Sequence, residues 1–330
     1  MGWYDRHADT SDGLLKLSCY GDWMSFNPTS NNGGASPFTP PPLVTAFFHV
    51  LAKKYLGEIA HALGNTTGAD FWAKNASRAS DSWHKLYYSP SAGGYAPCEQ
   101  NCFNTSRNGS QTSNSLALHL GISDPRILNR VISNLITDIR NFGNRTTVGI
   151  TGMAYLFDVL HDVGYDDVAL DVLSNDAYPS IGWFAHQNMT TLCENFACTF
   201  HDNGGGSQNH IMLAGFHSWL VNTLGGIRIG SDGKIHVRVP SSLLLGRMAM
   251  SDTDDDDVLI RTKKFIPGFG DATLEWKRNT NMLRLSVPVG ATAIVENVLL
   301  SGRDDGDSDT KTILLGSGVH NISLGPFSHQ

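Results

Sequence analysis

The stretch that decides the fold is YPSIGWFAHQNMTTLCENFACTFHDNGGGSQNHIMLAGFHSW, residues 178–219. It begins with aromatic residues around Trp183 and continues to Glu194, the one carboxylate in a run without other charged residues. The glycines at 204–206 predict a loop, and His210 is expected near the start of an apolar helix. Polar and aromatic side chains are therefore gathered between predicted helices.

These residue types suit a pocket that hydrolyses a sugar. Aromatic faces stack on a pyranose ring, imidazole and amide groups bind its hydroxyls, and a carboxylate activates water. Pro179 and Gly182 predict a turn that would place these side chains on loops. The alternatives are a surface or helix-capping role for Glu194 and a satisfied core position for His210.

At these residues the chain resembles family 78 glycoside hydrolases, the α-L-rhamnosidases. That family shows PSWGY…TTIWE…NH…GxxxxWL, and this chain reads PSIGW…TTLCE…NH…GFHSWL, one residue shorter in the last element. Further matches are YGDW at 20–23, QTSNSLAL at 111–118 and VGITG at 148–152. Two tryptophans of the family pattern are replaced here, by Ile181 and Cys193.

The resemblance implies a fold and a chemistry. The fold class would be multidomain, with a partial (α/α)6 six-hairpin toroid followed by an antiparallel β-sandwich. The activity would be inverting hydrolysis of terminal α-L-rhamnose from a rhamnose-containing glycoside or polysaccharide, without a cofactor or metal. Glu194 would be the general base, and Asp22, Trp23, Trp183 and His210 would contact the substrate.

The usual general acid has no counterpart in this sequence. In the family it lies in a DCPQR-type segment followed by GW and GD, which nothing here matches. The chain is therefore expected to carry the base but not the usual acid, and to expose apolar helix faces where part of the toroid is missing. The alternative is a non-catalytic carbohydrate-binding protein or an inactive fragment derived from the family.

Composition excludes some partners. The 330 residues are 41% hydrophobic and 17% charged, as in an ordinary globular protein. The formal charge of −7 argues against nucleic acid, because phosphate binding needs clustered Lys and Arg. No apolar run reaches the ~18 residues of a membrane span, and residues 1–5 lack the apolar core of a signal peptide.

Glycosylation sequons nevertheless favour a secreted protein, whereas the five cysteines are too few for a disulfide scaffold and leave the redox compartment open. Cys98 with Cys102, and Cys193 with Cys198, are close enough to pair, and neither pair has zinc-site spacing. We expect the sequon at Asn188 to stay unmodified, because a glycan there would crowd the pocket. The seven N-x-S/T sequons begin at Asn65, Asn75, Asn104, Asn108, Asn144, Asn188 and Asn321.

Helical periodicity dominates up to about residue 224. A toroid of six hairpins needs about twelve helices, and the pattern predicts about seven, so only part of it is expected. Trp72 and Trp83 lie on an apolar stripe and are expected in the core. The predicted helices cover 43–63 with a stop at Gly64-Asn65, a helix through 72–86, 111–120, a helix begun by Asp124-Pro125, 151–163, 166–173, and a closing helix to about 224.

After Gly225-Gly226 the period changes to two, which is typical of strands. We therefore expect a helical domain at 1–224 and an antiparallel β-sandwich at 225–330. The acidic run at 252–257 is expected to be a solvated turn rather than a calcium site, because no EF-hand Gly or closing Glu follows. The predicted strands are 234–239, 243–250, 258–263, 272–277, 282–287, 292–295, 311–315 and 319–324.

Overall fold

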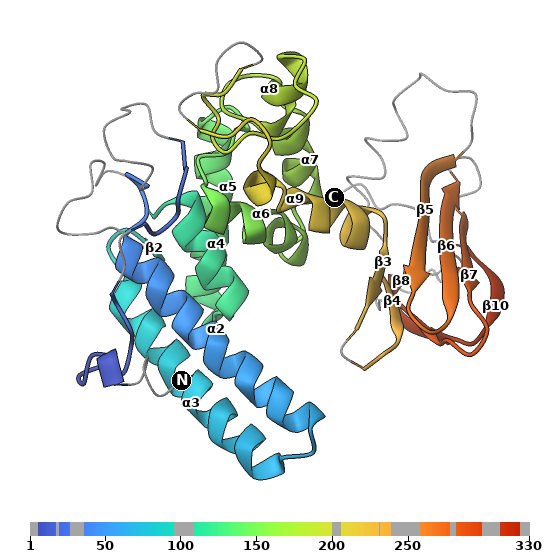
Figure 1. The fold of residues 1–330 in the computed structure, drawn as a ribbon, viewed down its shortest axis with the longest axis horizontal. Helices are drawn as coiled ribbons and strands as arrows, with labels where there is room; N and C mark the ends of the chain where they lie inside the picture. The colour runs from blue at the N-terminus through green and yellow to red at the C-terminus, as the bar shows by residue number, and fades with distance from the viewer. Residues whose placement is uncertain are drawn as a thin grey trace. The chain divides into compact units, whose positions relative to one another are not determined.

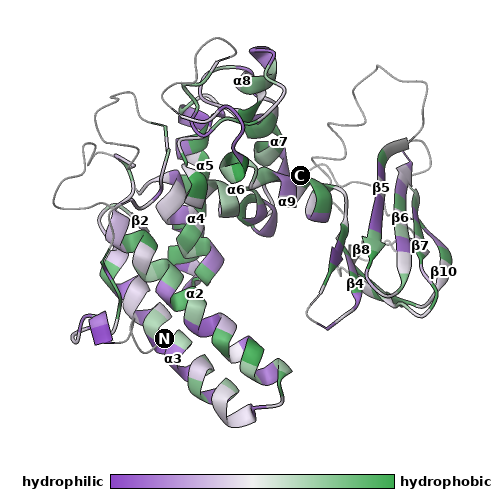
Figure 2. Ribbon diagram, viewed as in Figure 1, coloured by the Kyte–Doolittle hydropathy of each residue, from purple (hydrophilic) through white to green (hydrophobic). Residues whose placement is uncertain are grey.

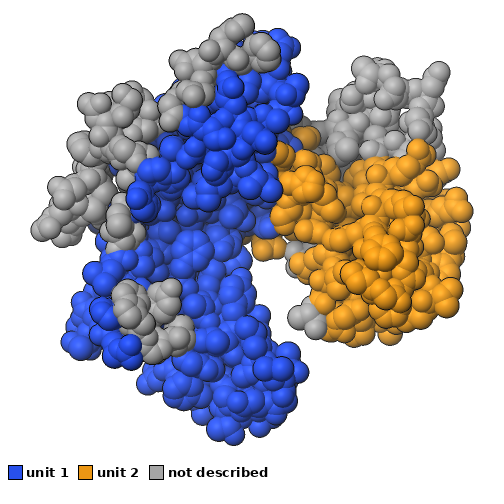
Figure 3. Space-filling model, viewed as in Figure 1, with its two compact units in different colours: residues 1–159, 171–215 blue, residues 160–170, 216–330 orange. Residues whose placement is uncertain are grey.

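The fold is taken from a computed structural model of the chain (Figure 1). It falls into two compact units, coloured separately in Figure 3. Unit 1 comprises residues 1–159 and 171–215, and unit 2 comprises residues 160–170 and 216–330. The structure describes residues 6–17, 20–26, 36–95, 109–199, 206–230, 232–238, 258–277, 282–298 and 311–323.

Unit 1 contains a long helical hairpin, α2 (Pro41–Ala62) and α3 (Thr66–Tyr87). α2 begins with prolines, whose fixed φ and missing N–H suit the first turn of a helix. It ends where Gly64 adopts a φ of +73°, which a glycine accepts without steric cost. Asn65 then caps α3, because its side chain accepts a hydrogen bond from the Gly68 N–H at 2.9 Å. The predicted helix stop is confirmed.

Helix α2 is apolar on more than one face (Figure 2). One face is buried and includes Phe47, which is 0% exposed. The other carries an exposed stripe at helical spacing: Phe48 is 46% exposed, Tyr55 48%, Ile59 55% and Leu63 79%. An apolar helix face open to solvent is what the partial toroid predicts.

Trp83 anchors the core of unit 1. Its ring is 0% exposed and stacks on Tyr95 with a centroid distance of 5.2 Å. Its indole N–H donates to the carbonyl oxygen of Leu43 at 3.1 Å, which joins α3 to α2. The expected core position of Trp83 is confirmed, whereas Trp72 on the same helix is half-buried.

Of the other elements formed up to residue 186, helices α4 to α7 follow the sequence signals closely. α4 has the predicted bounds, and Asp124 caps α5 by accepting from the Arg126 N–H at 2.9 Å. The short antiparallel strand pair was not expected, because two-residue strands carry no periodicity. These elements are β1 (Tyr88–Ser89), β2 (Gly94–Tyr95), α4 (Gln111–Leu120), α5 (Pro125–Asn141), α6 (Ile150–Asp162), α7 (Asp166–Ser174) and α8 (Ile181–His186).

Two predictions in the deciding stretch are wrong. The segment that begins at Gly182 is helical, as part of α8, rather than a turn. The closing helix is broken into η1 (Ile211–Leu213), a 3₁₀ turn, α9 (Phe216–Ser218) and η2 (Trp219–Leu224), a π-helix. The break falls at Gly215, where a Cβ would lie 2.8 Å from the Cα of Ala154. Close backbone packing at this glycine accompanies the interruption.

Unit 2 is dominated by two four-stranded sheets. One has the strand order β10-β7-β6-β5 and the other β3-β4-β8-β9. In β6 the buried residues alternate with less buried ones, as expected for a strand with one face on a core. The strands are β3 (Ile227–Ile229), β4 (Ile235–Arg238), β5 (Val258–Ile266), β6 (Gly270–Lys277), β7 (Met282–Val287), β8 (Ala293–Val298), β9 (Lys311–Leu315) and β10 (Gly318–Ser323).

One pairing differs from the predicted antiparallel arrangement. β4 pairs with β8 in parallel, with Ile235 opposite Ala293 and Val237 opposite Val295. Between these strands the chain builds β5, β6 and β7 in the other sheet, so it returns beside β4 by a crossover rather than a hairpin. The periodicity of a strand indicates which of its faces is buried. It does not indicate whether the strand runs parallel or antiparallel to its neighbour.

The helix-to-strand change and the compact units do not coincide. Residues 160–170 and 216–224 are largely helical, yet they group with the β-rich unit. The predicted domain boundary at 224/225 therefore remains a prediction. The predicted strand at 243–250 and the acidic run at 252–257 lie outside the described residues. Among the helices that the structure describes, none combines the length and apolar character needed to cross a membrane.

His84 makes the stability of unit 1 dependent on pH. Burial lowers its pKa below 6.5, and its Nδ1 lies 2.5 Å from the Tyr95 hydroxyl oxygen. Below pH 6.5 the unfolded chain therefore binds more protons at this residue than the folded chain does. The contribution of His84 to the unfolding free energy should fall from pH 7.5 to 5.5, by at most about 1.4 kcal/mol per pH unit. Urea unfolding at both pH values should show a weaker dependence in His84→Gln, but not in the exposed-residue control His61→Gln.

Candidate active site

Asp22 ties three motif segments together. Its side chain is fully buried, and its carboxylate accepts hydrogen bonds from the Thr112 hydroxyl on α4 and from the N–H groups of Gly149 (2.8 Å) and Gly152 (2.9 Å). A carboxylate suits the start of α6, because the first N–H groups of a helix lack intrahelical acceptors and the helix dipole is positive there. Burial raises the pKa of Asp22, and these hydrogen bonds oppose that shift.

Two glycines allow this close approach. A Cβ at Gly149 would lie 2.6 Å from the carbonyl oxygen of Asp22, and a Cβ at Gly152 would lie 2.6 Å from the Cβ of Val148. Both separations are shorter than packed atoms tolerate. Close packing therefore explains why both of these positions in the VGITG motif are glycine.

Asp22, which the sequence predicts to contact the sugar, lies away from solvent in this structure. The side chain is 0% exposed, and its described hydrogen bonds all come from the protein. Asp22 instead holds the loop that carries Trp23, whose carbonyl oxygen accepts from the Ile150 N–H at 2.9 Å. The geometry gives Asp22 a supporting role.

Replacing Asp22 should therefore destabilise the fold. Asp22→Ala leaves buried N–H donors at the start of α6 without an acceptor and should lower the unfolding free energy by about 2–4 kcal/mol. Asp22→Asn should also destabilise, because one acceptor oxygen becomes an NH₂ group that faces other donors. Asp176→Ala, an exposed control, should stay within about 0.5 kcal/mol. Chemical denaturation tests this, and a neutral Asp22→Ala would contradict the role.

A row of aromatic rings leads from the Asp22 loop to α8. Trp23 is half-buried, and its ring meets that of Tyr20 edge-on at 4.7 Å. Three residues further on, Phe26 contacts Tyr178 at 5.8 Å, and Tyr178 contacts Trp183 at 5.8 Å. Ring contacts thus run from Phe26 of this loop through Tyr178 to Trp183, while Trp23 contacts Tyr20.

Trp183 is held by the first turn of α8. Its N–H donates to the hydroxyl of the capping residue Ser180 at 3.0 Å, and its ring lies nearly parallel to His186, 6.2 Å away. The side chain is half-buried, and its indole nitrogen is enclosed without a hydrogen-bond partner. Such a donor is one that a ligand oxygen could satisfy.

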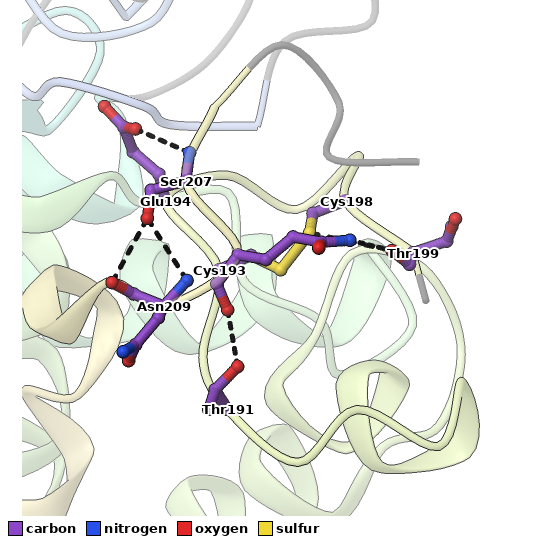
Figure 4. The surroundings of a disulfide bond; sticks show 8 residues. Thr191, Cys193, Glu194, Cys198, Thr199, Ser207 and Asn209 are labelled. Carbon is purple, nitrogen blue, oxygen red and sulfur yellow. Dashed lines mark hydrogen bonds between the residues drawn. A yellow bond between two sulfur atoms is a disulfide. The ribbon is translucent and has the colours of Figure 1, made fainter. Parts of the chain in front are cut away.

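Glu194 lies on a segment that pairs with residues 207–210 (Figure 4). Its N–H donates to the Ser207 carbonyl oxygen at 2.9 Å, and the Ser207 N–H donates to Glu194 Oε2 at 3.0 Å. Gly206 leaves room for this contact, since a Cβ there would lie 3.1 Å from the same carboxylate oxygen. The carboxylate is half-buried and held at one oxygen.

His210 belongs to the same paired segments. Its N–H donates to the Leu192 carbonyl oxygen at 2.8 Å, and its Nδ1 accepts from the Met212 N–H at 3.4 Å, which caps η1. The structure therefore places His210 on the segment beside that of Glu194, as the sequence prediction requires of a shared site.

A disulfide joins Cys193 to Cys198 beside Glu194 (Figure 4). This was one of the two pairings that the sequence left open, and the other, Cys98 with Cys102, lies outside the described residues. Phe196 in the same loop stacks on Phe184 of α8 with a centroid distance of 5.7 Å. The disulfide closes the Glu194 loop, and the ring pair attaches this loop to the helix that carries Trp183.

The sequence analysis missed Gly206 and Ser207 as partners of Glu194. The glycine run predicted a loop there, but the hydrogen bond comes from a backbone N–H, which no side-chain pattern reports. Among the residues that the structure describes, no group of three or more His, Cys, Asp or Glu side chains is placed to hold a metal ion.

The family comparison gives the class of protein, which is that of glycoside hydrolases with a six-hairpin glycosidase domain. Residues 1–224 match the bacterial α-L-rhamnosidase six-hairpin glycosidase domain, and the chain belongs to that family.

Individual relatives agree with this assignment. An α-L-rhamnosidase of Formosa agariphila is 24% identical over 312 residues, which cover 89% of this chain and 30% of the relative. The fold resembles an α-L-rhamnosidase of Dictyoglumus thermophilum (24% identity, TM-score 0.74, 95% of this chain and 34% of the other). It also resembles the Streptomyces avermitilis α-L-rhamnosidase complexed with L-rhamnose (18% identity, TM-score 0.72, 97% and 29%). The chain thus spans about a third of the length of these relatives.

Proposed function

We propose that this chain takes part in the hydrolysis of terminal α-L-rhamnose residues by an inverting mechanism, with Glu194 as the general base. The observation that carries the proposal is the half-buried Glu194 carboxylate, fixed at Oε2 by the Ser207 N–H, within a chain of the rhamnosidase family. The substrate is a rhamnose-containing glycoside or polysaccharide. No cofactor is needed for this chemistry.

In an inverting reaction the base removes a proton from water as that water attacks the anomeric carbon, while an acid protonates the leaving oxygen. The hydrogen bond from the Ser207 N–H to Oε2 orients the carboxylate. Trp183 and Trp23 provide aromatic faces for the sugar, and His210 provides an imidazole for its hydroxyls. Asp22 acts by holding the Trp23 loop.

A second candidate is a non-catalytic carbohydrate-binding protein. Ile181 and Cys193 stand where the family pattern has tryptophans, which reduces the aromatic surface available for stacking. Such a protein would bind L-rhamnose through Trp183 and His210 without a need for Glu194 as a base.

A substrate with a good leaving group separates these candidates. Fluoride departs without protonation, so hydrolysis of α-L-rhamnosyl fluoride requires the base but not the acid. The chain should release β-L-rhamnose from the fluoride, seen by NMR before mutarotation, and should show little turnover of an aryl α-L-rhamnoside. L-rhamnose binding without fluoride hydrolysis would favour the binding protein.

Glu194→Gln is the decisive variant. The amide keeps the shape but cannot take a proton, so kcat on the fluoride should fall by ~10²–10⁴, or about 3–5.5 kcal/mol in the barrier, with little change in KM. Azide, which needs no deprotonation, should partly rescue the variant and yield the β-configured glycosyl azide. The exposed-residue control Glu58→Gln should keep full turnover. An unchanged rate in Glu194→Gln would sink the assignment.

His210→Ala should give a different kinetic pattern. The loss of a hydroxyl contact weakens substrate binding, so KM should rise and kcat/KM should fall. Initial rates over a range of α-L-rhamnosyl fluoride concentrations give both kcat and KM. A fall in kcat alone would indicate a role in the chemical step instead.

We also infer that the protein is secreted. The Cys193–Cys198 disulfide supports this, because disulfides persist in oxidising compartments, and the glycosylation sequons agree with it.

A further inference from the structure

The Cys193–Cys198 disulfide closes a loop that contains the proposed base. The two cysteines are five positions apart, and Glu194 directly follows the first. Both cysteines are 0% exposed, so the cross-link lies in the packed part of the segment while Glu194 is only half-buried. The disulfide and the proposed general base Glu194 are therefore neighbours in the chain.

Hydrogen bonds between described residues also join residues 191–199 to residues 207–210 as a short ladder. They include two between Glu194 and Ser207, at 2.9 and 3.0 Å, and one from the His210 N–H to the Leu192 carbonyl oxygen, at 2.8 Å. The Thr191 hydroxyl also donates to the Gln208 carbonyl oxygen, and the Gln208 amide donates to the Thr199 carbonyl oxygen at 2.9 Å. Ser207 is exposed, so water competes for its backbone groups. A ladder of this size opens readily unless its ends are restrained.

One of the two cysteines lies at a position where this chain departs from the family pattern. The family pattern has TTIWE and this chain has TTLCE, so Cys193 occupies the tryptophan position. A disulfide restrains a segment by fixing the distance between two backbone positions. Phe196, inside the closed loop, adds its stacking contact with Phe184.

We propose that the Cys193–Cys198 disulfide is the positioning element of Glu194, which keeps the carboxylate against the Ser207 N–H, so that the site depends on this bond. The inference rests on the proposed function for its kinetic consequence and not for its structural one. A dithiol reductant breaks the S–S bond by supplying two electrons and two protons, which leaves two thiols and a cyclic disulfide of the reductant. The Glu194 loop then loses its covalent restraint.

The kinetic test uses Cys198→Ser, which removes only this disulfide. On α-L-rhamnosyl fluoride kcat should fall about tenfold or more, because a general base displaced by about 1 Å loses much of its effect. KM should stay within about twofold, since Trp183 and His210 still meet the sugar. Dithiothreitol should lower kcat of the parent chain to the same level and should not change Cys198→Ser further. Cys98→Ser/Cys102→Ser, the matched control, should keep both the parent kcat and its response to dithiothreitol.

Hydrogen exchange gives a readout that does not need turnover. Peptides that contain Ser207 should exchange at least about tenfold faster in Cys198→Ser and in the reduced parent chain, while peptides of α2 and α3 should keep the parent rate. A disulfide that contributed only to general stability would change both sets of peptides. If Cys198→Ser does not fold, Cys193→Ala/Cys198→Ala replaces it, and the reduced parent chain gives the same comparison.

The two proposals fail separately. If Glu194→Gln abolishes fluoride hydrolysis while Cys198→Ser retains the parent kcat and the parent exchange at Ser207, the positioning role is wrong and the function stands. If the parent chain does not hydrolyse the fluoride, the proposed function fails and the exchange rate at Ser207 alone decides the positioning role.

Discussion

The arrangement of unit 1 depends on one buried carboxylate. Asp22 accepts hydrogen bonds from Thr112 of α4 and from the first N–H groups of α6, so a loop near residue 22 fixes two helices that are distant in sequence. These groups are buried, and each would carry a desolvation cost if its partner were lost. Gly149 and Gly152 are small because the loop and the α6 terminus must come this close. Three motif segments that look independent in the sequence therefore form one structural unit.

The segment around Glu194 is held by backbone hydrogen bonds and a disulfide rather than by a buried carboxylate. The segment has little regular secondary structure, and its pairing with residues 207–210 runs through backbone groups and one carboxylate oxygen. A base needs an oriented carboxylate that remains accessible to water, which a deeply buried site would not allow. A short ladder beside a buried disulfide meets both needs. The covalent cross-link therefore lies next to the proposed reacting group in the chain.

The candidate site could be predicted from the sequence only in part. Glu194 and His210 were expected to share a site, and the structure places them on paired segments. Asp22 has the residue type of a sugar contact, but it is closed to solvent at a helix start. The sequence identifies Asp22 as a carboxylate, whereas its accessibility depends on packing by α4 and α6. The closing helix was likewise expected as one piece, until close packing at Gly215 interrupted it.

The sequence by itself determined the helices with clear caps and the strands with clear alternation. Asp124-Pro125 and Gly64-Asn65 act through bonds within a few residues, and the bounds of β7 and β9 follow from local periodicity. Only the tertiary structure decided the parallel pairing of β4 with β8, the disulfide partner of Cys193 and the donor that holds Glu194. The physical reason is range: local signals specify the backbone over a few residues. Strand direction, cross-links and backbone hydrogen bonds between loops arise when distant segments meet and bury their polar groups together.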